Sequence, residues 1–102
     1  MYNSLKKWIN VDLQIKPFLE VDGAGVAVYG ESVYTKCYPE EKIVTITDKN
    51  GVEVVSNTQL YLSGTTEINE LDKVVLNGKD TQIKSISLFY RNGLVDLKVI
   101  YL

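Results

Sequence analysis

Acidic side chains are the first candidates for chemistry in this sequence, because carboxylates serve as general acids, general bases and metal ligands. They gather at Glu40-Glu41 and in the polar stretch that contains Glu67, Glu70 and Asp72. Neighbouring residues of a strand point to opposite faces, so Glu40 and Glu41 would not converge on one reacting atom. We therefore predict that both groups are solvated surface residues rather than catalysts.

Two glycine-containing stretches match ligand-binding loops only in part. Gly23-Ala24-Gly25 lacks the third glycine of a dinucleotide-binding fingerprint, because Val28 stands at the required position. The stretch Asp48-Lys49-Asn50-Gly51 lacks the downstream oxygen ligands of a calcium loop. We interpret the first as a loop or hairpin tip and the second as a turn.

Histidine is absent from the sequence, and Cys37 is its one cysteine. Without histidine, the Ser-His-Asp and Cys-His arrangements of hydrolases cannot form within the chain. Zinc sites built from clustered cysteine and histidine are excluded as well. Cys37 lies in a strand-forming run and is predicted to be a small buried residue with an inert thiol. An enzyme is the least expected class, and no cofactor or metal is expected.

The charge balance argues against a protein that grips nucleic acid by its phosphates. The chain has 11 basic and 13 acidic residues, whereas phosphate binding normally requires a basic face. Tyr34, Lys36 and Tyr38 nevertheless alternate along one predicted strand, which is the pattern of a base-stacking platform. Aromatic residues on strands also fill cores and interfaces. A nucleic-acid-binding module of the OB or SH3 type therefore stays an alternative.

Strand-forming residues dominate the composition, with 13 Val, 8 Ile and 7 Thr against two Ala. Turn signals recur between apolar runs, at Asn50-Gly51, Ser63-Gly64, Asn77-Gly78 and Asn92-Gly93. This pattern predicts one all-β domain over residues 1–102, an antiparallel sheet closed into a small barrel with long inter-strand loops. Residues 1–9 fit a short N-terminal helix.

The expected strands follow from the apolar runs between these turns. They are residues 11–16, 33–38, 43–47, 52–62, 74–76, 82–90 and 94–102. We expect Pro39-Glu40-Glu41 to interrupt the chain between the second and third strands. In the last strand, the face that carries Val95, Leu97, Val99 and Tyr101 is the better candidate for the core.

Residues 22–32 break this regularity and are predicted to form a projecting loop. Residues 26–29 are apolar, although exposed loops are usually polar. They belong either to a strand or to a surface that meets another chain. The glycines at positions 23, 25 and 30 would allow the segment to change conformation.

One part of the pattern resembles a known family. The hairpin Asn50-Gly51-Val52-Glu53-Val54-Val55-Ser56 and the spacing from Asp72 to Gly78 resemble the minor capsid or head-closure (stopper) proteins of tailed bacteriophages. The resemblance covers about two-thirds of the chain and continues into the final strand. Leu94-Val95-Asp96 departs from the family, whose members often carry histidines before this strand.

The resemblance implies a structural protein of the virion, assembled in the host cytoplasm. It implies a homo-oligomeric ring of barrel subunits in the head-to-tail connector, which closes the DNA-filled head and provides the docking surface for the tail. The implied partners are portal or adaptor proteins on the head side and a tail-terminator or tail-completion protein on the tail side. Double-stranded DNA would pass without sequence-specific binding, and no membrane is involved. A head–tail joining or tail-terminator protein at a neighbouring position is the alternative.

In that family an inter-strand loop projects toward the channel or contacts a neighbouring subunit. The candidate residues for this loop are Gly23, Gly25, Val26, Val28, Tyr29 and Gly30. A second candidate contact loop comprises Glu40, Glu41, Lys42 and Lys49.

Overall fold

The computed structural model describes residues 8–102, and the helix expected over residues 1–9 falls almost entirely outside this range. The described chain is all-β, as predicted, with extents of 46 × 30 × 29 Å. No helix long and apolar enough to cross a membrane occurs in residues 8–102. The strands are β1 (Val11–Lys16), β2 (Phe18–Val21), β3 (Ala27–Tyr29), β4 (Val33–Thr47), β5 (Glu53–Ser63), β6 (Lys73–Leu76), β7 (Lys79–Gln82), β8 (Ser85–Arg91) and β9 (Leu94–Tyr101).

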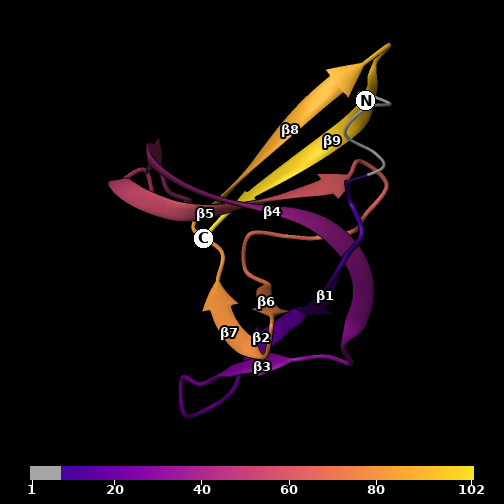
Figure 1. Cartoon of the computed structure of the whole chain (residues 1–102). Coiled ribbons are helices and arrows are strands. Elements are labelled where there is room, and N and C mark those ends of the chain that lie inside the picture. Colours follow the sequence, from indigo (N-terminus) through magenta and orange to yellow (C-terminus); the bar gives the residue numbers. More distant parts are fainter. Residues whose placement is uncertain (1–7) are drawn as a thin grey trace.

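The strands form one large antiparallel sheet and one small one (Figure 1). The large sheet has the order β7-β6-β1-β4-β5-β9-β8, and β2 pairs only with β3. In the described part of the chain β7 and β8 are the two edges of the large sheet, and they do not pair with each other. The sheet is therefore strongly bent but not closed, and the barrel stays a prediction.

Strand β4 holds the large sheet together by changing its partner midway. Residues 33–37 pair with β1, and residues 38–47 pair with β5. The expected interruption at Pro39-Glu40-Glu41 is wrong, because β4 continues through these residues. Pairing with β1 ends at Cys37, so one side of the next residues carries no ladder and tolerates a proline that lacks an N–H. A bulge between Glu41 and Val44 bends the strand further, and the curved β4 crosses the whole molecule in Figure 1.

The core lies between the two halves that β4 joins. Its buried residues come from both halves and from the connections: Leu13, Ile15, Cys37, Leu60, Leu62, Ile68, Val74, Ile83, Ile100 and Leu102. The prediction that Cys37 is buried is confirmed. Burial, with a smaller effect of the Asp12 charge, raises the pKa of the Cys37 thiol to about 11, so the reactive thiolate is disfavoured at neutral pH.

The predicted core face of the last strand is right for Val99, which is buried, but not for the main core cluster. That cluster takes Ile100 and Leu102 from the opposite face. The register explains this outcome, since Leu60 of β5 lies directly opposite Ile100, and paired residues share a face of the sheet. Lys98, on the same face, reaches past the core and donates from Nζ to the carbonyl oxygen of Thr66.

The single strand expected over residues 82–90 is divided into β7 and β8. At the break, Ile83 is fully buried and the Lys84 N–H donates to the Tyr101 carbonyl at 2.8 Å. Lys49, at the tip between β4 and β5, donates from Nζ to the Ile83 carbonyl at 2.7 Å. These contacts redirect the chain from one sheet edge to the other.

Gly64 lies closer to a neighbouring backbone than any other glycine of the chain. A Cβ atom added there would lie 1.9 Å from the Val95 carbonyl oxygen, while the Gly64 N–H donates to the Asp96 carbonyl at 3.2 Å. Gly23, in contrast, has open space where a Cβ would stand.

Gly64→Ala is therefore expected to lower the free energy of unfolding by about 3 kcal/mol, because a backbone atom must move to accept the methyl group. Urea denaturation measures the change. Gly23→Ala is the matched control and should stay within about 0.5 kcal/mol of the natural protein. Equal stabilities of the two variants would contradict the close approach.

Candidate interaction surfaces

The first candidate segment lies on a hairpin that projects from the body. This β2–β3 arm comprises residues 18–29, with its tip at residues 22–26, and stands at the bottom of Figure 1. Gly23, Gly25 and Val26 lie at the tip, Val28 and Tyr29 lie in β3, and Gly30 lies at the base. The structure thus brings the predicted residues together and adds β2, which the sequence analysis did not predict as a strand.

The tip of the arm is a hydrogen-bonded turn. One carboxylate oxygen of Asp22 accepts hydrogen bonds from the backbone N–H groups of Ala24 and Val26, both at 2.9 Å. Gly25 adopts a φ of 82°, which a residue with a side chain rarely occupies. The glycine thus serves a defined turn.

The same turn closes the hairpin between β4 and β5. Asp48 accepts hydrogen bonds from Asn50 and Val52 at 2.9 Å, and Gly51 has a φ of 80°. The Asp-x-x-Gly-Val spacing occurs at both tips, so comparing residues 22–26 with residues 48–52 would have revealed the second turn. The sequence analysis interpreted Gly23-Ala24-Gly25 as a loop or hairpin tip but did not compare it with residues 48–52.

A buried carboxylate anchors the base of the arm. Asp72 is 4% exposed, and its two oxygens accept the N–H groups of Phe18 and Asn69, each at 2.8 Å. The prediction that Asp72 is a solvated turn residue is wrong. Its partner Phe18 lies 54 positions away along the chain, so no local pattern could indicate this contact.

Contacts of aromatic rings also hold the two strands of the arm together at its base. Phe18 meets Tyr29 edge to face, with 6.1 Å between the ring centroids. Lys73 Nζ lies 4.9 Å from the centroid of the Tyr29 ring. Tyr29 is therefore a structural residue of the base.

Beyond its base, the arm exposes apolar side chains and acidic groups. Leu19, Val21 and Val26 are largely exposed, Val26 by 60%. Residues 17–31 carry three acidic residues and no lysine or arginine. An isolated two-stranded hairpin is marginally stable in water, so a partner that covers these side chains would stabilise it.

A second projecting hairpin, the β8–β9 arm (residues 85–98), extends from the opposite end of the molecule (Figure 1). Asn92 and Gly93 both have positive φ, 53° and 79°, as a two-residue hairpin turn requires, and this predicted turn is confirmed. The arm also exposes large apolar side chains, namely Leu88, Phe89, Tyr90 and Leu94. The sequence analysis missed this surface, although apolar residues on both faces of residues 85–91 are a signal for it.

The second candidate contact loop is not a free loop. Glu40, Glu41 and Lys42 lie within β4, whereas Lys49 lies at the β4–β5 tip and is bound to the body through Ile83. Glu40 accepts a hydrogen bond from the Tyr61 hydroxyl at 3.0 Å. The Lys42 carbonyl accepts one from the Gln59 side chain at 2.9 Å. These residues therefore contribute to the body of the fold.

The row Tyr34, Lys36 and Tyr38 lies along the first part of β4. Tyr34 is 75% exposed, but Lys36 forms an ion pair with Asp12. The Tyr38 ring packs against the Tyr61 ring, with 5.8 Å between centroids. Of these three residues only Tyr34 offers an exposed ring for base stacking, and the charge of Lys36 is paired with Asp12. The row is therefore a small surface for binding nucleic acid. In residues 8–102 no cluster of His, Cys, Asp or Glu has the arrangement to hold a metal ion.

Replacing Asp72 is expected to destabilise the fold at the base of the β2–β3 arm. Asp72→Ala removes a buried carboxylate that accepts two backbone N–H groups and should lower the free energy of unfolding by about 2 kcal/mol. Urea denaturation measures the loss, and limited proteolysis should cut the arm faster. Glu70→Ala, an exposed change in the same connection, is the control and should alter stability little. A loss no larger than that of the control would exclude the anchoring role.

Tyr61 is expected to make stability depend on alkaline pH. Burial, and then the hydrogen bond to Glu40, raise the pKa of the Tyr61 hydroxyl to about 12. An unfolded tyrosine titrates at about 10, so the unfolded state loses its proton first and stability falls between these two pH values. In the Tyr61→Phe variant the free energy of unfolding should depend less on pH between these two values. Urea denaturation at a series of pH values measures this dependence. Cys37 titrates in both proteins, so the difference between the curves isolates Tyr61, and parallel curves would refute the assignment.

The chain matches no protein-family model, no curated protein and no solved structure in these comparisons. Function is therefore inferred from three features: the body formed by the bent sheet, the two arms, and the resemblance of the turn and strand pattern described above.

Proposed function

We propose that this protein is a structural subunit of the head-to-tail connector of a tailed bacteriophage. In this role, copies of the chain form a ring that closes the DNA-filled head and provides the docking surface for the tail. The observation that carries the proposal is that two arms at opposite ends of one small body each expose several large apolar side chains, together half of those exposed in residues 8–102. The resemblance of residues 50–56 and 72–78 to head-closure proteins supplies the class of assembly.

The polar groups of the body support a structural role. Asp72, Glu40 and Lys49 are among the residues with the most obvious chemistry in the sequence, and each of them holds one part of the fold to another. Both arms leave large apolar side chains exposed, as does the body at positions such as Ile43 and Val55. Large exposed apolar surfaces of this kind are typical of protein contacts rather than of catalysis.

The charge of the chain suits a wall past which DNA slides. A net charge of −2 gives no strong attraction for phosphates, and tight phosphate binding would hold the DNA in place. Many copies in a ring would add weak contacts into a stable assembly. In this proposal the bent sheet is the barrel-like wall of each subunit, with strand pairing along the free β8 edge extending it into the neighbouring copy.

Two other functions remain as alternatives. A neighbouring connector position, such as head–tail joining or tail termination, would use the same arms and body. A single-stranded nucleic-acid module is favoured by one observation, the 75% exposure of Tyr34 beside a hollow lined by Thr35 and Thr66. Salt-sensitive oligonucleotide binding that Tyr34→Ala abolishes would identify this module.

Light scattering on the purified protein tests the connector proposal. The protein is measured alone, with double-stranded DNA, and with the portal and adaptor proteins encoded beside it. We expect multimers, formed alone or on the adaptor, whose mass does not change with DNA. A protein that stays monomeric alone and in the presence of portal and adaptor would overturn the proposal.

A further inference from the structure

We propose that the β2–β3 arm of one copy docks head to tail on the β8 edge and the β8–β9 arm of the next copy. The inference rests on the ring proposed above and names the surfaces that build it. Both surfaces belong to this chain, and they differ from each other. The contact is therefore heterologous and can repeat from copy to copy until the ring closes.

Both surfaces have a strand edge without a partner within residues 8–102. In the described part of the chain, no third strand pairs with β2 and β3. Strand β8 is seven residues long and forms one edge of the large sheet. The other edge, β7, has four residues, and its Asp80 pairs with Lys16 at 3.0 Å. Short, charged edges resist pairing with other chains, so β8 is the edge open to an added strand.

Both surfaces also expose apolar side chains that can pack against each other. The arm offers Leu19, Val21 and Val26, which are aliphatic and protrude from a narrow hairpin. Beside β8 lies a shallow hollow of about 270 Å³, lined mainly by Ile68, Leu71, Ile86 and Leu88 together with Asn69 and Glu70. When a strand is added to a sheet edge, its backbone pairs with the edge strand and every second side chain packs into pockets beside that strand. The hollow beside β8 is a candidate for such a pocket.

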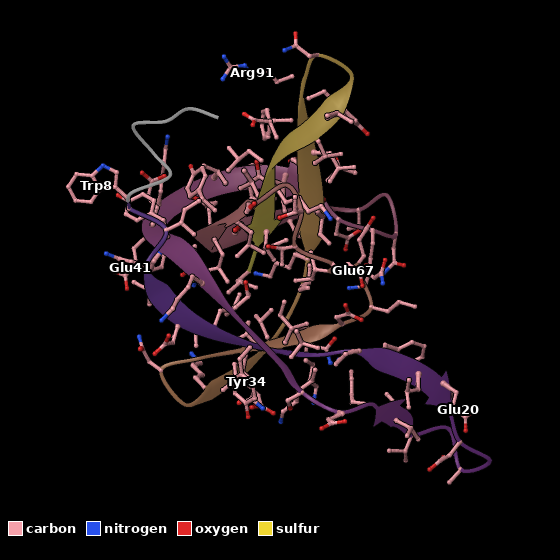
Figure 2. The ribbon with its side chains drawn as sticks, turned by 90° about the vertical axis from the view of Figure 1, so that its right-hand side faces the viewer. Trp8, Glu20, Tyr34, Glu41, Glu67 and Arg91 are labelled. Atoms are coloured by element: carbon pink, nitrogen blue, oxygen red, sulfur yellow. The ribbon has the colours of Figure 1, made fainter. Side chains whose placement is uncertain are left out.

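The two arms also differ in charge. Residues 17–31 carry three acidic residues and no basic one, whereas the β8–β9 arm (residues 85–98) carries Arg91 and Lys98 against Asp96. Figure 2 shows Glu20 and Arg91 at opposite ends of the molecule, so the two cannot meet within one chain. Opposite charges on surfaces that lie this far apart favour attraction between copies rather than within one.

Disulfide trapping between two different variants tests this geometry. Val21→Cys or Val26→Cys protein is mixed with Tyr90→Cys or Leu94→Cys protein under mild oxidation, and products are read on non-reducing gels. At least one of the four mixtures should give cross-linked heterodimers well above the level of either variant alone. Val55→Cys, exposed on β5 and outside both arms, replaces either partner as the control. The native Cys37 is buried and does not compete.

Charge reversal gives a second, independent readout. Arg91→Glu should raise the concentration needed for self-association, measured by light scattering, by about tenfold or more. Lys79→Glu makes the same change of charge on β7 and should have a much smaller effect. Matching urea midpoints for the two variants and the natural protein show that folding is intact.

The outcomes separate this contact from the proposed ring. Cross-linked heterodimers together with weaker association of Arg91→Glu support the head-to-tail contact. Multimers that form without any of the four cross-links overturn it while leaving the connector function in place. A protein that stays monomeric at every concentration overturns it as well, and the connector function is then decided by assembly with portal and adaptor.

Discussion

The change of partner along β4 is the constraint on which the rest of the structure depends. One strand pairs with β1 as far as Cys37 and with β5 from Tyr38 onward, so two sheet halves share a single backbone. The bulge after Glu41 adds to the bend. Because the halves face each other across the bend, residues 8–102 bury one continuous core with strands and their connections alone.

The same bend determines which parts of the chain lie outside the hydrophobic core. The core takes residues from β1, β4, β5, β6 and β9. The β2–β3 arm and the β8–β9 arm extend beyond it at the two ends of the fold. Strands β2 and β3 leave the body at Pro17 and return at Gly30, where the Gly30 N–H donates to the Pro17 carbonyl at 2.7 Å. Projecting arms are thus a consequence of a small core, and their uncovered apolar residues make self-assembly a physically reasonable function.

Polar side chains hold the connections in place where strand ladders cannot. Asp72 fixes the connection before β6 to the start of β2, and Lys49 fixes the link between β7 and β8. Lys98 of β9 donates to the Thr66 carbonyl and so fixes the connection between β5 and β6 to β9. Each bond joins segments at least 30 positions apart, so these residues look like ordinary surface charges in the sequence and become structural only after folding.

Local patterns determined the strand content, most of the hairpins and the burial of Cys37, because alternation and Gly-containing turns act over a few residues. They also marked residues 22–32 as unusual, and the Asp-x-x-Gly-Val spacing held enough information to identify its tip as a turn. Tertiary structure alone decided that β4 continues through Pro39, that Ile100 rather than Val95 enters the core, and that Asp72 is buried. Each of these outcomes depends on which distant strand lies alongside, and pairing between distant strands is set by the packing of the whole core.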